Sequence, residues 1–181
     1  MSQEPILYIF GGLPASGKST LARHFAKTIG AAYIRIDSIE EAIIANGQLV
    51  GPEGYQAAYN LAGDNLDNGL SVVADSVNPV TITRTAWKEV ATSRGLHYRE
   101  IEVVCSNEAE HRKRLESRES QSKIARVLSW EDVERREYET WEGSYVFDTS
   151  GETKDESWDR FEKEFALCKN CLLYTSPSPR D

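Results

Sequence analysis

The sequence predicts an α/β domain built as a three-layer α/β/α sandwich, in which helices cover both faces of a five-stranded parallel sheet. Two observations carry this prediction. Short apolar segments rich in β-forming residues alternate with longer segments of helical spacing, as expected for parallel strands joined by crossover helices. The 181 residues, 40% of them hydrophobic and 28% charged, also suit a single globular domain with a substantial core.

The first strand and the first helix flank a glycine-rich segment. Ile6–Phe10 (ILYIF) is short, apolar and followed by a Gly-Gly pair, which indicates a buried strand. Ser19–Ile29 places apolar residues at helical spacing and is followed by Gly30, a common residue at helix C-termini. Ala32–Ile36 is the second predicted strand, because it is again short and rich in β-forming residues.

The middle of the chain continues this alternation. Ser38–Ile44 is expected to be a short helix, because an Asn-Gly pair lies just beyond it. Tyr55–Leu66 carries apolar residues at helical spacing and precedes a second Asn-Gly pair. Leu70–Ala74 is the third predicted strand, and Thr81–Ser93 is the helix after it.

The last third of the chain supplies the remaining elements. Tyr98–Val104 and Tyr145–Phe147 are the fourth and fifth predicted strands, and Asn107–Ser117 and Trp130–Trp141 are predicted helices between them. A final helix is indicated by three aromatic residues at helical spacing, Trp158, Phe161 and Phe165.

We assign residues 1–170 to one domain and treat the end of the chain separately. Residues 171–181 (CLLYTSPSPRD) resemble a translated sequencing-library adapter, and a disordered Ser/Pro tail is the alternative. The segment is therefore left out of the fold prediction. The sequence leaves open whether the natural C-terminus is present.

Three strand ends are expected to meet at one edge of the sheet. Gly11 follows the first strand, Asp37 follows the second and Asp75 follows the third. In open parallel sheets, ligands bind outside the carboxyl ends of the strands, which lie at the same edge. The sequence therefore predicts one site at this edge, built from residues that are far apart along the chain.

The segment after the first strand fits a phosphate-binding motif. Residues 12–19 (GLPASGKS) match G-x-x-x-x-G-K-[ST], with the required strand before the motif and the required helix after it. Loop amides and the helix N-terminus can hold the phosphates of ATP, Lys18 can reach the β- and γ-phosphates, and Ser19 can ligate Mg²⁺. The predicted nucleotide contacts are Gly12, Pro14, Ala15, Ser16, Gly17, Lys18, Ser19 and Thr20. A purely structural glycine loop is the alternative.

Two aspartates are candidates for the chemistry. Asp75 ends the apolar segment SVVAD and resembles the acid that holds Mg²⁺ in nucleotide-binding proteins, so Ser19 and Asp75 are the predicted metal ligands. Asp37 ends YIRID, and it could accept the proton of a substrate hydroxyl or position that hydroxyl in line. The alternative for Asp75 is a cap of the next turn, and for Asp37 it is a helix N-cap.

A basic segment interrupts the acidic chain. Residues 111–126 contain six Lys or Arg and two Glu. Arg114 and Arg118 share a helical face and could close over a transferring phosphoryl group. We expect a lid at about residues 112–129, in which Arg114 and Arg118 act in catalysis beside Lys18 and Asp37, with Arg126 as a further candidate. A solvated charged helix is the alternative.

These motifs together resemble a known family. With GLPASGKST, RIDS, VVADS and the R-x-x-x-R of Arg114 and Arg118 in this order, the chain resembles small P-loop kinases of the nucleoside-kinase-like type. This group includes predicted AAA-type small-molecule kinases, chloramphenicol phosphotransferase, adenylylsulfate kinase, zeta toxins and the kinase domain of polynucleotide kinase. The resemblance covers roughly residues 6–165. It implies a P-loop NTPase fold with strand order 2-3-1-4-5 and a mobile helical lid, Asp37 as acceptor base, and lid arginines on the nucleotide phosphates.

The composition excludes some other classes. A net charge of −8 argues against binding to nucleic acid or to an anionic membrane surface. No apolar run approaches the roughly 18 residues of a membrane span, and no signal peptide is recognisable. Cys105 and Cys168 lie far apart and Cys171 belongs to the terminal segment, so we expect reduced thiols and a cytoplasmic protein.

The sequence therefore favours an ATP-dependent phosphotransferase with Mg²⁺ as cofactor and a small-molecule hydroxyl as acceptor. One alternative is a nucleotide-binding ATPase or switch without transfer chemistry, although the guanine signature of a GTPase is missing. The other is a polynucleotide 5′-hydroxyl kinase, which the net acidity opposes. The acceptor, the choice between ATP and GTP and the oligomeric state stay open at this stage.

Overall fold

The computed structural model of the chain describes residues 4–119 and 128–171, without the side chains of residues 118, 119 and 166–171. The predictions for the Arg118 side chain, for Arg126 and for the terminal segment 172–181 therefore lie outside the described residues. The same holds for the central part of the expected lid. Within the described ranges, no helix combines the length and the apolar composition that a bilayer span requires.

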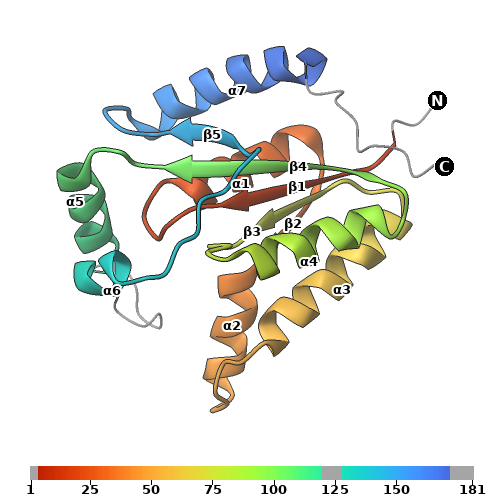
Figure 1. Cartoon of the computed structure of the whole chain (residues 1–181), viewed down its shortest axis with the longest axis horizontal. Coiled ribbons are helices and arrows are strands. Elements are labelled where there is room, and N and C mark those ends of the chain that lie inside the picture. The colour runs from red at the N-terminus through yellow and green to blue at the C-terminus, as the bar shows by residue number, and fades with distance from the viewer. Residues whose placement is uncertain (1–3, 120–127, 172–181) are drawn as a thin grey trace. The chain divides into compact units, whose positions relative to one another are not determined.

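The five strands form one sheet in the order β2-β3-β1-β4-β5, and all neighbouring strands are parallel (Figure 1). The strands are β1 (Ile6–Gly11), β2 (Ala32–Arg35), β3 (Val72–Asp75), β4 (His97–Val104) and β5 (Tyr145–Asp148). The helices are α1 (Lys18–Ile29), α2 (Ile36–Ala45), α3 (Glu53–Asp67), α4 (Thr81–Thr92), α5 (Glu108–Glu119), α6 (Trp130–Glu134) and α7 (Lys154–Cys171). The predicted α/β class, the parallel sheet and the strand order are confirmed.

The chain divides after Gly151 into two compact units. The first unit contains the whole sheet and helices α1 to α6, and the second contains α7. In the second unit, the guanidinium of Arg160 contacts the carboxylates of Glu152 at 2.6 Å and Glu164 at 3.1 Å. The stacked rings of Phe161 and Phe165, 5.2 Å apart, confirm that these predicted aromatic residues share one helix face.

The core of the first unit lies on both faces of the sheet, because successive side chains of a strand point to opposite faces. On one face, Leu7 and Ile9 of β1 belong to a buried cluster with Trp87 of α4. On the other face, Phe25 of α1 packs against Tyr8 and Phe10, with ring centroids 4.8 and 5.9 Å apart. The helices α3 and α4 therefore cover one face and α1 covers the other, which gives three layers within this unit.

The register of the sheet places the residues of the predicted site beside one another. Asp75, the last residue of β3, pairs with Phe10 of β1 and with Arg35 of β2. The phosphate-loop segment that follows β1 and the start of α2 that follows β2 therefore leave the sheet beside Asp75. The expected convergence of the three strand ends at one edge is confirmed.

The sequence prediction was wrong about the length of α6. This helix ends at Glu134 rather than at Trp141. Ser129 begins it through a capping box, but the residues beyond it turn toward α4 instead of continuing the helix. The guanidinium carbon of Arg84 lies 5.2 Å from the ring centre of Tyr138 and 4.7 Å from that of Trp141. Tyr138 and Trp141, which the prediction placed in this helix, instead pack around one buried cation.

Arg84 also fixes the segment that follows the third strand. Its guanidinium donates to the carbonyl oxygens of Asn78 at 2.9 Å and Pro79 at 3.2 Å, just beyond β3. It also donates to the carbonyl oxygens of Thr140 at 2.9 Å and Glu139 at 2.6 Å, which precede β5. We call these five residues the Arg84 cluster. The cluster joins two loops that flank the candidate site.

Candidate nucleotide-binding site

The loop between β1 and α1 has a backbone that requires glycine at two motif positions. Gly12 has a φ angle of 139° and Gly17 one of 97°, both in the region that side chains disfavour. A Cβ on Gly12 would collide with the carbonyl oxygen of Val103, and one on Gly17 would approach Thr149 to 3.2 Å. The two glycines of the motif are therefore needed for the shape of the loop.

The carbonyl groups of this loop are held from outside by neighbouring elements. The hydroxyl of Thr149 donates to the carbonyl of Ser16 at 2.7 Å, and the imidazole Nε2 of His111 lies 2.7 Å from the carbonyl of Pro14. His111 is buried in this contact. Because these two carbonyl oxygens already have partners, neither would face a bound anion as an unpaired negative group.

Two further features of the loop suit an anion. The side-chain oxygen of Ser16 is buried and has no hydrogen-bond partner in the described part of the chain. The amides of Lys18 and Ser19 belong to the first turn of α1, where the helix has no carbonyl to offer them. A buried polar group without a partner is costly, so a ligand that accepts these hydrogen bonds would stabilise the loop. The loop therefore fits the phosphates of ATP.

Lys18 and Asp75 form a buried ion pair at the centre of the site. The Nζ atom of Lys18 lies 2.8 Å from Oδ1 of Asp75, whose side chain is only 1% exposed. The Tyr33 hydroxyl donates to the other oxygen, Oδ2, at 2.6 Å. Burial acts to raise the pKa of Asp75, but the charge and the hydrogen bond of Lys18 and the hydrogen bond of Tyr33 hold this pKa below its ordinary value. Asp75 is therefore an ionised carboxylate, and its interpretation as a turn cap is wrong.

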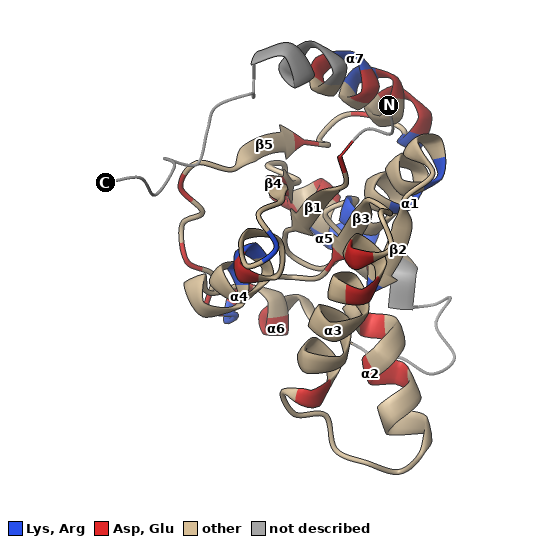
Figure 2. Cartoon of the chain, turned by 90° about the vertical axis from the view of Figure 1, so that its right-hand side faces the viewer, with Lys and Arg blue, Asp and Glu red and all other residues tan. Residues whose placement is uncertain are grey.

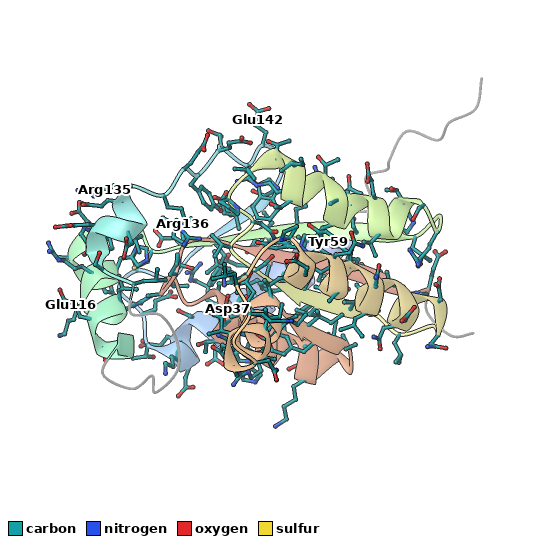
Figure 3. The ribbon with its side chains drawn as sticks, turned by 90° about the horizontal axis from the view of Figure 1, so that it is seen from below. Asp37, Tyr59, Glu116, Arg135, Arg136 and Glu142 are labelled. Atoms are coloured by element: carbon teal, nitrogen blue, oxygen red, sulfur yellow. The ribbon has the colours of Figure 1, made fainter. Side chains whose placement is uncertain are left out.

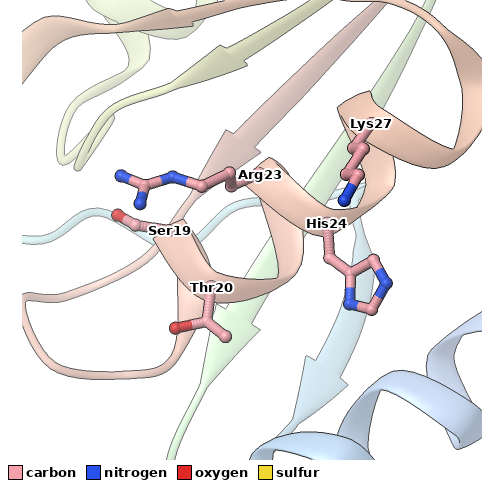
Figure 4. A pocket seen from close by; sticks show the side chains of 5 residues that line it. All are labelled: Ser19, Thr20, Arg23, His24 and Lys27. Carbon is pink, nitrogen blue, oxygen red and sulfur yellow. The ribbon is translucent and has the colours of Figure 1, made fainter.

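The donor atoms around Lys18 also fit a magnesium ion. The Nζ atom of Lys18 donates to two oxygen atoms, Oδ1 of Asp75 at 2.8 Å and the hydroxyl oxygen of Ser19 at 3.4 Å. One cation can thus reach both predicted metal ligands, and oxygen is the donor that Mg²⁺ prefers. Ser19 projects from α1 on the same side as Arg23, in a pocket also lined by other residues of α1: Thr20, His24 and Lys27 (Figure 4).

Asp37 lies at the same edge of the sheet, in the first turn of α2. Its Oδ2 atom accepts a hydrogen bond from Arg35 at 2.9 Å, and a second acid, Glu41, lies 3.8 Å from the same guanidinium nitrogen. The helix begins at Ile36, two residues before the predicted start at Ser38, with Arg35 at the N-cap position and no capping side chain. The alternative of Asp37 as N-cap is therefore wrong, and its carboxylate is one-third exposed and accessible to a substrate (Figure 3).

Residues that the sequence did not single out lie around Asp37. Burial and then the charge of Asp37 raise the pKa of Glu40, while Arg136 acts to lower it. Burial, with the charge of Glu40, raises the pKa of Tyr55 to about 12. The acidic residues of α2 are visible in Figure 2. The spacing of Asp37 and Glu40 on one helix face was the only sequence signal for this group.

The predicted lid residues are partly described. Arg114 donates to the hydroxyl of Thr149 at 2.7 Å and to its carbonyl at 2.8 Å, and it contacts Glu110 at 2.6 Å. Since Thr149 also holds the carbonyl of Ser16, Arg114 is connected to the phosphate loop through one residue. The role of Arg114 on nucleotide phosphates stays a prediction, as does that of Arg118.

Asp148 lies next to this network, as the last residue of β5. It accepts hydrogen bonds from the amides of Ser106 and Ser150, at 3.1 and 3.0 Å, and from the hydroxyl of Ser150 at 2.7 Å. Burial acts to raise its pKa, but these hydrogen bonds hold the pKa well below the ordinary value. The Asp148 carboxylate therefore organises the turn after β5.

The chain was compared with solved structures and with curated proteins. The APS kinase CysC of Mycobacterium tuberculosis, in complex with AMPPNP and APS, has a TM-score of 0.66 and 16% identity, covering 90% of this chain and 98% of that one. A gluconokinase from Sinorhizobium meliloti 1021 has a TM-score of 0.64 and 16% identity over 96% and 99% of the chains. Kti12 of Chaetomium thermophilum, in complex with ADP-AlF3, has a TM-score of 0.66 and 17% identity over 88% and 97%. No curated protein was similar enough to count as a match.

These likenesses establish a fold shared with small P-loop kinases, since the identities are too low to carry more. A family match adds to this result. The family described as "AAA domain" matches residues 7–142, three-quarters of the sequence, and this range includes the phosphate loop, Asp37 and Asp75. The chain belongs to this AAA-domain family and has the P-loop kinase fold.

Proposed function

We propose that the chain is an ATP-dependent phosphotransferase that moves the γ-phosphate of ATP to a hydroxyl group of a small molecule. The observation that carries the proposal is the buried Lys18–Asp75 ion pair, which lies beside a glycine-shaped loop and next to Asp37. Two of the similar structures hold nucleotide ligands, AMPPNP with APS in one and ADP-AlF3 in the other, which supports a nucleotide site in this fold.

Lys18 and the loop would bind the nucleotide. In the structure, the Lys18 ammonium is neutralised by Asp75 in a nearly water-free position. A triphosphate offers this ammonium a second anionic partner, and the loop amides can bind the same phosphates. Ser19 and Asp75 would hold Mg²⁺, which supplies neutralisation of the phosphate charge and orientation of the phosphate oxygens.

Asp37 would prepare the acceptor. A carboxylate within hydrogen-bond reach of a hydroxyl can position it in line and take its proton as the phosphoryl group arrives. Arg35 holds one oxygen of Asp37 from the side of the sheet, which fixes the direction of the carboxylate. Arg114, and Arg118 with it, would stabilise the spread charge of the phosphoryl group.

A direct test compares Asp37→Asn with Glu41→Gln, because both acids face the Arg35 guanidinium. Acceptor-dependent ADP release would be screened over hydroxylated metabolites, antibiotics, nucleotide sugars and oligonucleotides. On the acceptor found, Asp37→Asn should lower turnover by about 100-fold or more while ATP affinity stays within a factor of two or so. Glu41→Gln should keep nearly all of the turnover.

Three outcomes would decide against the proposal or narrow it. Full activity of Asp37→Asn on the true acceptor would remove Asp37 from its role. Hydrolysis of ATP without any acceptor-dependent product would favour a nucleotide-binding ATPase or switch. Phosphorylation of an oligonucleotide with salt-sensitive binding would favour a polynucleotide kinase, against the net charge of the chain.

A further inference from the structure

Tyr33 makes a contact with Asp75 that neither the motif nor the proposed function explains. Its hydroxyl donates to Oδ2 of Asp75 at 2.6 Å, while Lys18 contacts Oδ1 at 2.8 Å. The two oxygens of the carboxylate are thus held by different donors. Tyr33 comes from β2, the strand next to β3, so the contact crosses the sheet at the level of the site.

The surroundings of Tyr33 keep its hydroxyl in this position. The guanidinium of Arg23 lies over the Tyr33 ring at 5.7 Å, which holds the ring between α1 and the sheet. A phenol hydroxyl can act only as a donor toward an ionised carboxylate, which offers only acceptor oxygens.

Lys18 and Tyr33 differ in what can replace Asp75 as their partner. The ammonium of Lys18 belongs to the phosphate-binding motif and would gain a phosphate when a nucleotide binds. Tyr33 lies outside the motif, and its hydroxyl has no such second partner. When Lys18 turns to the phosphates, Oδ1 is released, whereas Oδ2 stays bound to Tyr33. The carboxylate then keeps its orientation with one oxygen available.

We propose that Tyr33 is a positioning residue that holds the Asp75 carboxylate in the orientation needed for magnesium. This inference rests on the proposed function, because it assumes that Asp75 serves a magnesium–nucleotide complex. Hydrogen bonds to a metal-binding carboxylate fix its direction, and their loss commonly lowers metal affinity by about 10-fold to 100-fold. A tyrosine that only fills space beside α1 would have no such effect on the metal.

The test compares Tyr33→Phe with Tyr59→Phe. Both substitutions remove one phenol hydroxyl and keep the ring, but Tyr59 donates only to the carbonyl of Thr83, at 3.4 Å, and packs on Trp87. Binding of the β,γ-imido analogue of ATP would be measured by calorimetry, first in EDTA and then over a series of Mg²⁺ concentrations. Thermal unfolding of each variant would be recorded beside the titrations.

We expect Tyr33→Phe to raise the Mg²⁺ concentration for half-maximal enhancement of analogue binding by about 10-fold. Its affinity in EDTA should match the wild type, and Tyr59→Phe should match the wild type in both conditions. Unchanged Mg²⁺ dependence in Tyr33→Phe would overturn the proposal, and so would an equal loss of affinity with and without Mg²⁺. Failure of Tyr33→Phe to fold would show a structural role and also overturn it. If the wild-type protein binds no analogue at all, the proposed function itself fails.

Discussion

Two buried cations stabilise the first unit of this protein, and they are held in opposite ways. Lys18, 7% exposed, has one ionic partner, Asp75, and one weak contact with the hydroxyl of Ser19. Arg84, 2% exposed, donates to four main-chain carbonyl groups and lies over two aromatic rings. The partner of Lys18 is thus a charged carboxylate, whereas the partners of Arg84 are uncharged carbonyl groups and aromatic rings.

The difference shows that ligand binding and the stabilisation of loops are carried out by different buried cations in this fold. A single ionic contact can be exchanged when another anion arrives, because the ammonium of a lysine is compact and its stem is flexible. A planar guanidinium that fills several fixed acceptors cannot move without leaving all of them unpaired. Lys18 therefore suits a ligand that comes and goes, whereas the Arg84 cluster keeps the loops around that ligand in place.

The largest effect is expected from breaking the exchangeable contact. Lys18→Met keeps most of the side-chain stem but removes the charge, so the phosphates lose their ammonium and Asp75 loses its partner. We expect acceptor-dependent phosphoryl transfer to fall by about 1,000-fold. Lys163→Met, at an exposed position of α7, is the control and should retain at least half of the wild-type rate. Comparable loss in both variants would contradict a specific role for Lys18.

The next effect concerns the fixed cation and should appear in stability. Arg84→Met leaves the carbonyl groups of the Arg84 cluster without their buried donor, which should lower the free energy of unfolding by about 3 kcal/mol. Arg94→Met is the control, because Arg94 pairs with the exposed carboxylate of Asp67 at 2.8 Å and such pairs contribute about 1 kcal/mol at most. Urea unfolding would measure the free energy of unfolding of both variants. Equal decreases would show that the Arg84 cluster stabilises the protein no more than a surface ion pair does.

The same difference explains what the sequence could predict. The phosphate loop, its lysine and the acid at the end of β3 were predictable, because each is set by a short motif in a local strand or helix context. The parallel sheet then placed Asp37 and Asp75 at one edge without any contact being known. Local patterns therefore sufficed for the part of the molecule that resembles other proteins.

The Arg84 cluster was not predictable in this way. Arg84 and Thr140 are 56 positions apart. Every residue has a main-chain carbonyl group, so the sequence does not show which of them accept hydrogen bonds from Arg84. The sequence instead predicted a longer α6. The role of Tyr33 was also not predicted, because tyrosine is common in strands of any sheet. Only the structure shows that its hydroxyl contacts Asp75 on the neighbouring strand.

The smallest effect is expected from a change of pH on the free energy of unfolding. This effect should differ between the Lys18 and Arg84 variants. The folded state holds the pKa of Asp75 below its ordinary value of 3.8. A lowered pKa stabilises the protein above the unfolded value, and this stabilisation is lost as pH falls through the folded value. Lys18→Met removes the partner that keeps this pKa low, so the pKa of Asp75 should be higher in the folded variant than in the folded wild type. The destabilisation should therefore be largest above the pKa of the variant and shrink as pH falls through it toward the lower pKa of the wild type.

Arg84 gives the contrast, because the four main-chain carbonyl groups to which it donates do not titrate. The loss of stability in Arg84→Met should therefore stay the same between pH 7 and pH 3, while the loss in Lys18→Met decreases over the same range. Urea unfolding of the wild type and both variants at pH 7, 5, 4 and 3 would measure this, with each variant compared to the wild type at the same pH so that other carboxylates cancel. A constant loss in Lys18→Met down to pH 3 would mean that the Lys18–Asp75 contact does not stabilise the ionised carboxylate, and the two cations would then differ in burial alone.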